Sequence, residues 1–396
     1  MRLVAAAVAA LLTVGCTAPA EAPAPVSPPP EAQLTEPLRA RLQARLDAHR
    51  TDHDYPGAIA GVWTPAGVWV GVTGLAGRGS DRPPGRADHT RIGSVTKTFT
   101  VMALLQLVDR RQASLDDSIG TYIPGVPNGD TATLRDLARM TSGIPSYTDN
   151  VDFIRAWAAD PATTDFTPTQ LVDFAKTQPA LFPAGSRYHY SNTNTVLLGM
   201  VIEKVTGAPV AEFFRTNLVE PLGLSGTSFA GQSRDLPEPH LDGITDQPGA
   251  DVAELGIPLP PGGPVRDATH WSPSWEFTAG AMVSTLDDLR TWTQALATGG
   301  GLVSEDIQRE REASVGTTLG RLDPDDPAAT YGLGFFSLRG WWGHDGSVPG
   351  YTTYAAHHPQ QQTSVVVFVN SDIRPPDQPK GPAVSLAEDI QSALND

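Results

Sequence analysis

The order of elements along the sequence predicts an α/β fold, an α+β three-layer sandwich built on one antiparallel sheet. Five strand-like stretches lie near the two ends of the chain, at residues 56–63, 67–75, 331–338, 352–356 and 363–370. Helical pieces and loops fill the long region between them. Strands at both ends indicate a sheet that is assembled from the two ends of the chain and flanked by helices. A mainly helical lobe is then inserted at about residues 116–270, and a cleft between sheet and lobe is the expected place for a site.

The folded domain is expected to begin at residue 38 and to continue to residue 396. Apolar residues recur at spacings of four in Leu38, Leu42 and Leu46, which is typical of an amphipathic helix. The first two strands are short and a turn at residues 64–66 joins them, so they should form a β-hairpin. A closing helix is expected at about residues 384–394. Two stretches rich in turn-forming residues, 231–270 and 310–330, are expected to be surface loops.

Composition and charge narrow the possible functions. The chain has 396 residues, of which 40% are hydrophobic and 18% are charged, as in a globular protein. Its formal net charge of -16 argues against binding to nucleic acids. The sole cysteine, Cys16, cannot form an internal disulfide, and no Cys/His cluster predicts a metal site. We therefore expect neither a metal nor another cofactor.

The N-terminus predicts export from the cytoplasm. Residues 1–16 join Met1-Arg2 to an apolar run, which has the length and charge of a signal peptide. Residues 13–16 resemble a bacterial lipobox, in which the cysteine, here Cys16, becomes the lipidated N-terminus on the membrane. An ordinary signal peptide cut after Ala20 is the alternative, and it would give a secreted protein. Residues 17–37 are rich in proline, alanine and glutamate and should form a disordered tether.

The first stretch that carries chemistry pairs Ser94 with Lys97. If Ser94 opens a helix, Lys97 follows one turn later on the same face, where its amine can reach the serine hydroxyl. The apolar run at residues 101–108 predicts that this helix is buried. Burial disfavours the ammonium form of lysine, and a helix N-terminus favours negative charge on the serine oxygen. The pair is therefore a candidate nucleophile beside its base.

Two further motifs stand downstream of this pair. Tyr190-x-Asn192 lies in a loop that leads into a helix, and on its own it is more typical of a capped loop than of a functional site. The stretch His344-Asp345-Gly346-Ser347 lies within a glycine-bracketed strand edge, which lets a substrate backbone approach closely. On its own it is more typical of a plain glycine-rich hairpin.

Together, in this order, the three motifs resemble those of the penicillin-recognising serine hydrolases, in particular the DD-carboxypeptidases of the class C β-lactamase superfamily. That family carries Ser-x-x-Lys, Tyr-x-Asn and a Lys/His-Thr-Gly strand around one cleft. The resemblance runs from about residue 40 to the C-terminus. Shorter stretches also resemble family members, among them Thr141-Ser142-Gly143-Ile144, Pro183-Ala184-Gly185, Ser274-Trp275 and Tyr331-Gly332-Leu333-Gly334.

The resemblance implies a β-lactamase/transpeptidase-like fold and a role for each matching residue. Lys97 would help to deprotonate the hydroxyl of Ser94, which would attack an acyl carbonyl and form an acyl-enzyme. Tyr190 would carry the proton to the leaving group. The remaining residues would bind substrate. Asn192 would bind an amide of the substrate, Trp275 would line the cleft, and His344 would lie near a substrate carboxylate. The edge of the strand beside the substrate would consist of Asp345, Gly346 and Ser347. The backbone N–H groups of Ser94 and Ser347 would form the oxyanion hole.

Two positions depart from the carboxypeptidase pattern. Asp345 stands where the family usually has a threonine that binds the substrate carboxylate. Phe335 and Phe336 stand where close members carry an arginine, with Arg339 only nearby. The acyl-transfer residues match the family, whereas the carboxylate-recognition residues do not.

The resulting hypothesis is an exported serine hydrolase, most simply a D-Ala-D-Ala carboxypeptidase or β-lactamase-like acyl hydrolase. Its partners would be a small-molecule or peptide acyl substrate, including cell-wall peptide, and the membrane through the lipid. An esterase or D-amino-amidase on the same fold is the alternative. A catalytically silent binding lipoprotein is the alternative of another class. A Ser-His-Asp hydrolase is disfavoured because the chain has no Gly-x-Ser-x-Gly elbow.

Overall fold

The computed structural model describes residues 31–256, 264–315, 329–375 and 378–395. The described residues from Ala32 onward belong to one compact unit. Cys16, the predicted signal peptide and most of the predicted tether lie outside the described residues. Within the described part of the chain, no helix combines the length and the apolar composition that a membrane span requires.

One antiparallel sheet of seven strands forms the centre of the fold, in the order β2-β1-β12-β11-β10-β9-β8. Its strands are β1 (Gly57–Thr64), β2 (Gly67–Gly74), β8 (Ala329–Tyr331), β9 (Phe336–Leu338), β10 (Trp341–Val348), β11 (Tyr351–His358) and β12 (Thr363–Val369). The N-terminal hairpin joins the C-terminal strands where β1 pairs with β12. The sheet is therefore built from both ends of the chain, and the predicted fold class is confirmed.

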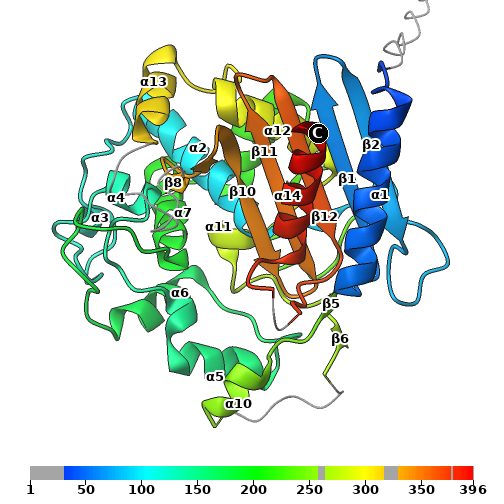
Figure 1. The fold of residues 1–396 in the computed structure, drawn as a ribbon. Coiled ribbons are helices and arrows are strands. Elements are labelled where there is room, and N and C mark those ends of the chain that lie inside the picture. The colour runs from blue at the N-terminus through cyan, green and yellow to red at the C-terminus, as the bar shows by residue number, and fades with distance from the viewer. Residues whose placement is uncertain (1–30, 257–263, 316–328, 376–377, 396) are drawn as a thin grey trace, which may run out of the picture. The chain divides into compact units, whose positions relative to one another are not determined.

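Helices cover both faces of this sheet (Figure 1). The first and last helices, α1 (Glu36–His53) and α14 (Pro382–Asn395), pack side by side on one face. On the other face lie α2 (Thr96–Asp109) and α12 (Leu286–Thr298). Because both faces are covered, every residue of β12 is buried, and its side chains alternate between the two cores.

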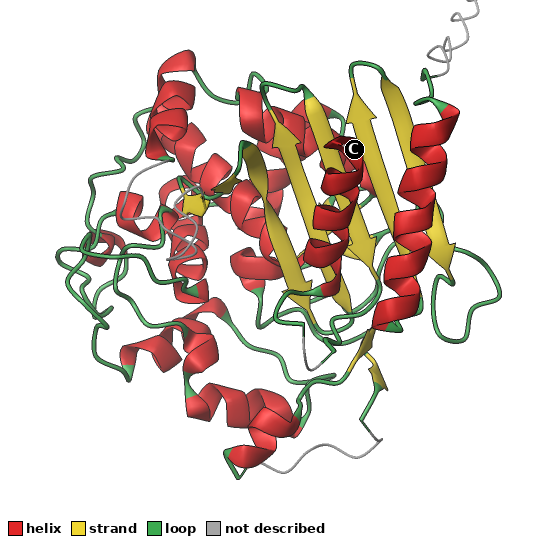
Figure 2. Cartoon of the chain, viewed as in Figure 1, coloured by secondary structure: helices red, strands yellow, loops and turns green. Residues whose placement is uncertain are grey.

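Short helices and loops on the side of α2 away from the α1/α14 layer form the helical lobe, as the secondary-structure colouring in Figure 2 shows. They pack around a second core of their own. The α-helices of the lobe are α3 (Ile119–Tyr122), α4 (Leu134–Ala138), α5 (Val151–Ala159), α6 (Pro168–Lys176), α7 (Asn192–Thr206), α10 (Ala250–Glu254), α11 (Phe277–Gly280) and α13 (Glu305–Ser314). Two further helices, α8 (Val210–Phe214) and α9 (Glu220–Leu222), pack instead against the core on the α2 side of the sheet. Three further single turns are η1 (Gly93–Val95), η2 (Tyr147–Asp149) and η3 (Arg215–Val219).

Several local expectations are wrong in detail. The single strand expected at residues 331–338 is two strands, β8 and β9, because the backbone turns at Gly334. That residue has a φ of 80°, and a Cβ there would lie 2.5 Å from the side chain of Val101 in α2. A glycine thus lets the turn pack closely against the helix.

The middle of the chain contains strands that the sequence pattern does not reveal. A three-stranded sheet forms from β3 (Thr90–Arg91), β7 (Met282–Ser284) and β4 (Ser228–Phe229), and β5 (Ile244–Thr245) pairs with β6 (Arg266–Asp267). These strands are two or three residues long, too short for an alternating pattern. The expected loops are also partly structured, because α13 extends to Ser314 and α10 lies within 231–270.

The folded part begins slightly before the predicted boundary at residue 38. Leu34 is buried and its backbone N–H donates to the carbonyl of Val68 in β2 at 3.1 Å. The N–H of Val68 in turn donates to the carbonyl of Ala32 at 2.8 Å. Residues 32–37, which we assigned to the tether, therefore belong to the edge of the sheet and the start of α1.

Candidate active site

Ser94 lies in η1, the tight turn that leads directly into α2. The helix behind it is fixed in the core, since the Phe99 ring stacks on Trp292 with a centroid distance of 3.6 Å. The Trp292 indole N–H also donates to Thr98 Oγ1 at 2.7 Å. A serine at the N-terminal end of such a helix is held in a rigid position.

Lys97 is fully buried one turn along α2, as its spacing predicts. Its Nζ donates to Ser94 Oγ at 2.9 Å and to the carbonyl oxygen of Ala279 in α11 at 2.8 Å. Burial lowers the pKa of Lys97, while the nearby charges of Glu276 and Asp345 raise it in part. The outcome is an amine that gives up its proton more readily than an exposed lysine and that touches the serine oxygen.

Tyr190 completes this group from the loop before α7. The Lys97 Nζ lies 5.0 Å from the centroid of the Tyr190 ring. Burial raises the pKa of the Tyr190 phenol well above its ordinary value, and the nearby Tyr331 adds to this, whereas a hydrogen bond to Ser94 lowers it. At neutral pH the phenol is therefore protonated and lies within reach of both Ser94 and Lys97.

Strand β10 runs close against the Ser94 turn, and two glycines permit this approach. A Cβ on Gly346 would lie 2.0 Å from the carbonyl oxygen of Ile92, and one on Gly93 would lie 2.8 Å from the Ser347 nitrogen. Gly93 also has a φ of 51°, which favours glycine. The backbones of Ser94 and Ser347 are thus brought together. The Cα of Gly346 therefore lies against the backbone of the Ser94 turn, and Gly346 is not among the lining residues of the cavity described below.

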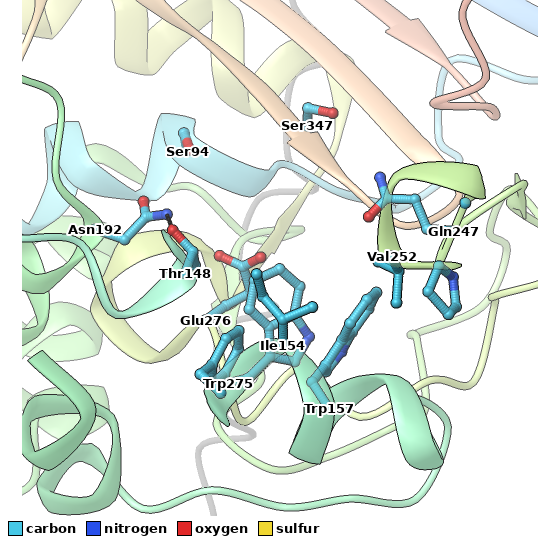
Figure 3. A pocket seen from close by; sticks show the side chains of 13 residues that line it. Ser94, Thr148, Ile154, Trp157, Asn192, Gln247, Val252, Trp275, Glu276 and Ser347 are labelled. Carbon is cyan, nitrogen blue, oxygen red and sulfur yellow. Dashed lines mark hydrogen bonds between the residues drawn. The ribbon is translucent and has the colours of Figure 1, made fainter. Parts of the chain in front are cut away.

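A cavity of about 320 Å³ opens beside Ser94 (Figure 3). This volume is near the lower end of the range for small-molecule sites. The lining residues are Ser94, Thr148, Phe153, Ile154, Trp157, Asn192, Gln247, Pro248, Gly249, Val252, Trp275, Glu276 and Ser347. Of the predicted residues, Ser94, Asn192, Trp275 and Ser347 therefore line one space.

The floor of the cavity is aromatic, and sequence analysis found only one of its residues. Trp275 was predicted, and the structure adds Trp157, whose ring centroid lies 5.6 Å from that of Trp275, and Phe153 at 6.1 Å. Both additional residues lie on α5, more than 100 positions from Trp275 in the sequence. Aromatic residues on an amphipathic helix are normally core residues, so their pattern gave no signal.

Gln247 forms another wall, and a buried carboxylate holds it in place. Asp372 accepts hydrogen bonds from Gln247 Nε2, from Thr245 Oγ1 at 3.1 Å and from the N–H of Gly350 at 2.9 Å. The last contact ties the wall to the turn between β10 and β11. The segment 231–270, expected to be a surface loop, thus contributes directly to the cavity.

Asn192 faces the cavity from the first turn of α7. Its Nδ2 donates to Thr148 Oγ1 at 3.3 Å, as Figure 3 shows. Its Oδ1 is buried and has no hydrogen-bond partner within the described part of the chain. A buried acceptor of this kind is costly unless it is satisfied, so it is suited to a donor on a ligand.

Glu276 is a further lining residue that sequence analysis missed. Glu276 is only 5% exposed, and Figure 3 shows its carboxylate directed into the cavity. Burial raises the pKa of Glu276, and the charges of Lys97 and Arg91 oppose this. The only signal in the sequence was its position next to Trp275, and one acidic residue among 44 does not stand out.

His344, which the resemblance places near a substrate carboxylate as a positive charge or as a hydrogen-bond donor, carries no positive charge near neutral pH. Its side chain is 3% exposed, its Nε2 lies 3.0 Å from the Tyr331 hydroxyl and its Nδ1 lies 2.5 Å from the Asp345 carbonyl oxygen. Burial lowers the pKa of His344, and the charge of Lys97 lowers it further, although Asp345 acts in the opposite sense. The imidazole is therefore neutral near pH 7, because desolvation outweighs the adjacent carboxylate.

Asp345 and His344 are also absent from the lining of the cavity. The Asp345 side chain is 49% exposed, and its Oδ1 lies 3.7 Å from His344 Nδ1. It still raises the pKa of Lys97 and of Tyr190, so its charge acts on the neighbourhood of Ser94. Elsewhere among the residues with described positions, no group of three or more His, Cys, Asp and Glu side chains could hold a metal ion.

Comparisons with known proteins agree with this geometry. Residues 39–388 match the Beta-lactamase family, so the chain belongs to that family. The fold, the family and the arrangement of Ser94 and Lys97 define the chain as a serine hydrolase of the penicillin-recognising superfamily.

Among solved structures, a D-stereospecific amidohydrolase from Streptomyces sp. is 32% identical, with a TM-score of 0.74 over 88% of this chain and 97% of that one. The D-amino acid amidase of Ochrobactrum anthropi SV3 has the same fold, with 23% identity and a TM-score of 0.76 over 91% of this chain and 99% of that one. The curated relative PbpX of Bacillus subtilis (strain 168) is 25% identical over 70% of this chain. The match spans only 61% of the length of PbpX and 52% of the length of the protein flp of Staphylococcus aureus.

Proposed function

We propose that this protein hydrolyses amides or esters that carry no free carboxylate, through an acyl-enzyme on Ser94. The observation that carries this proposal is the charge of the cavity. Within the described part of the chain, the lining residues include one acidic side chain, Glu276, and no lysine, arginine or histidine. A carboxypeptidase substrate would bring its terminal carboxylate into this space without a cation to bind it.

The chemistry follows from the contacts around Ser94. The neutral Lys97 amine takes the proton from Ser94 Oγ as this oxygen attacks the acyl carbonyl carbon. The negative charge that develops on the carbonyl oxygen is stabilised by the backbone N–H groups of Ser94 and Ser347. The proton then passes through the Tyr190 phenol to the leaving nitrogen or oxygen, and the acyl group remains on Ser94.

Water completes the turnover. A water molecule gives one proton to the neutral Lys97 amine and attacks the carbonyl carbon of the acyl-enzyme. The proton then passes to Ser94 Oγ as the bond between Oγ and the acyl carbon breaks, which releases the acid and restores the Ser94 hydroxyl. Asn192 is placed to accept a hydrogen bond from a substrate N–H, because its Oδ1 has no other partner among the described residues. Trp275 and the aromatic floor would hold the acyl side chain.

Two comparisons support hydrolysis of amides and esters rather than carboxypeptidase activity. The solved structure with 32% identity is named a D-stereospecific amidohydrolase, and the one with 23% identity is named a D-amino acid amidase. The cavity volume of about 320 Å³ also suits a single amino-acyl group better than a long peptide.

The test is intact-mass spectrometry of the protein after exposure to esters, amino-acid amides, penicillins and D-alanyl peptides. We expect a mass increase with the carboxylate-free donors, and we expect Ser94→Ala to abolish it. Ser225→Ala, which removes an exposed serine outside the cavity, is the matched control and should keep the adduct. An adduct that survives Ser94→Ala would refute the assignment of the nucleophile. Faster loading by D-alanyl peptides than by their esters would favour a carboxypeptidase instead.

A further inference from the structure

Glu276 is an unusual residue to find in the wall of an acyl-transfer cavity. Its carboxylate makes no hydrogen bond and no ion pair with any other residue in the described ranges, although the residue is only 5% exposed. The charges that act on it, those of Lys97 and Arg91, are not in contact with it. The Lys97 amine donates hydrogen bonds to Ser94 Oγ and to the carbonyl oxygen of Ala279, and Arg91 donates to the carbonyl oxygens of neighbouring loops.

A buried carboxylate without a partner is energetically unfavourable. Close packing of neighbouring side chains does not account for this burial, because the absence of a side chain at Gly280 leaves room for the carboxylate. A Cβ on Gly280 would lie 2.1 Å from Glu276 Oε2 and 2.7 Å from Glu276 Cδ. The glycine one turn further along α11 therefore leaves the room that the carboxylate occupies. The side chain is directed into the same cavity that Ser94 lines (Figure 3).

We propose that Glu276 binds the ammonium group of an amino-acyl substrate, so that the preferred acyl donor is an amino-acid amide or ester with a free amine. This inference rests on the proposed function and names its substrate class. In such a donor the ammonium group is one carbon away from the acyl carbon that Ser94 attacks. The side chain of the amino acid would extend over Trp275, Trp157 and Phe153, which favours an aromatic or large apolar side chain.

Charge complementarity explains why this pairing is specific. An ammonium donor gives Glu276 the hydrogen bonds and the counter-charge that the protein itself does not supply. A donor without the amine would leave the carboxylate buried and unpaired. A hydrogen bond to a charged group of this kind corresponds to roughly a ten- to a hundredfold preference for the amine.

The experiment measures binding with the chemistry switched off. Ser94→Ala is titrated calorimetrically with phenylalanine amide, each enantiomer separately, and with 3-phenylpropanamide, which differs only by lacking the amine. We expect at least one enantiomer to bind about ten- to a hundredfold more tightly than 3-phenylpropanamide. In Ser94→Ala/Glu276→Gln this ratio should fall to near one.

Two further variants make the result specific to the position of the carboxylate. Gly280→Ala in the Ser94→Ala background places a methyl group where Glu276 Oε2 lies, so it should also lower the ratio, and it provides the test if Glu276→Gln fails to fold. Glu254→Gln removes an exposed acidic group from α10 and should leave the ratio unchanged. It controls for the loss of one negative charge near the cavity.

The outcomes separate this inference from the proposed function. Equal affinities for the two amides in Ser94→Ala would overturn the inference, as would an unchanged ratio after Glu276→Gln. Equal weakening of both amides in that variant would show that Glu276 only positions its neighbours, and it would also overturn the inference. An amine preference in Ser94→Ala together with no acyl adduct in the wild type would support the ammonium site and refute the proposed function.

Discussion

Lys97 is the residue on which the proposed chemistry most depends, and its burial determines its behaviour. Its amine is shielded from solvent and contacts Ser94 Oγ at 2.9 Å, so the charged form is disfavoured where the base is needed. Two carboxylates, Glu276 and Asp345, act in the opposite direction by raising its pKa. The balance between desolvation and these charges determines the pH at which Ser94 becomes reactive.

We therefore predict that acylation of Ser94 by an ester without an amine rises with pH through the pKa of Lys97. The sign follows from the role of the residue, since only the neutral amine can accept the serine proton. The apparent pKa should lie below 10.5, the ordinary value for lysine, because burial lowers it. Stopped-flow measurement of the acylation rate across the pH range in which the protein stays folded gives this value.

Glu276→Gln should shift that profile to lower pH. The substitution removes a negative charge that stabilises the ammonium form of Lys97, so the amine loses its proton more readily. Glu254→Gln is the control, because Glu254 is exposed on α10 and is not among the groups that affect the pKa of Lys97. A profile that moves to higher pH in Glu276→Gln would show that another group controls acylation.

At the scale of single elements, β10 is the strand that lies closest to Ser94 and that carries Asp345. The sequence shows its glycines and places Asp345 where relatives bind a substrate carboxylate. The structure adds that the neighbouring His344 is neutral, because it is buried and bonded to Tyr331 and to the backbone. The strand therefore presents a carboxylate without a compensating cation.

We predict that Asp345→Thr selectively accelerates acylation by donors that carry a carboxylate. A substrate carboxylate about 4 Å from Asp345 is disfavoured by roughly 4 kcal/mol at an effective dielectric near 20, and the half-exposed position of Asp345 reduces this figure through screening by solvent. The comparison uses one carboxylate-bearing donor and its methyl ester, each with wild type and with the variant. The acid should gain rate and the methyl ester should not. Equal changes for the two donors would show that Asp345 does not select against carboxylates.

Sequence and structure agree best where a function is carried by neighbours in the chain. The spacing of Ser94 and Lys97 fixes their contact because a helical turn brings such residues onto one face. The β1/β2 hairpin and the buried strand β12 were likewise predictable from local patterns. These are properties of short segments that long-range packing did not alter.

The rest of the site depends on contacts between distant segments, which no local pattern encodes. Trp157 and Gln247 reach the cavity only because α5 and the segment before α10 fold over it. The neutrality of His344 follows from burial against Tyr331, which lies on another strand. Glu276 indicates a substrate preference only because, among the described residues, its buried carboxylate has no hydrogen-bond or ion-pair partner. The sequence therefore predicts the acyl-transfer residues, and the structure is needed for the substrate preference.

At the scale of the whole molecule, we propose that the N-terminal residues determine where in the cell the catalytic domain is held. Attachment to a membrane is a proposal that rests on the sequence of residues 1–16 alone. From the resemblance of residues 13–16 to a lipobox we propose that Cys16 carries a lipid. A tether of about fifteen residues, 17–31, at up to about 3.1 Å each would then let the catalytic domain reach a few nanometres from the membrane, a range that includes cell-wall peptide.

We predict that the mature protein expressed in a lipoprotein-processing bacterium partitions into detergent and incorporates a fatty-acid label. Cys16→Ser should lose both properties, because the thiol is the group that would be acylated, and Ser94 should still load with acyl donors in that variant. Ser27→Ala, another conservative change of a small polar residue in the predicted tether, is the matched control and should keep the label. Metabolic labelling followed by detergent phase separation measures both. A water-soluble wild-type protein that begins near Glu21 would show instead that an ordinary signal peptide is removed and that the enzyme is secreted.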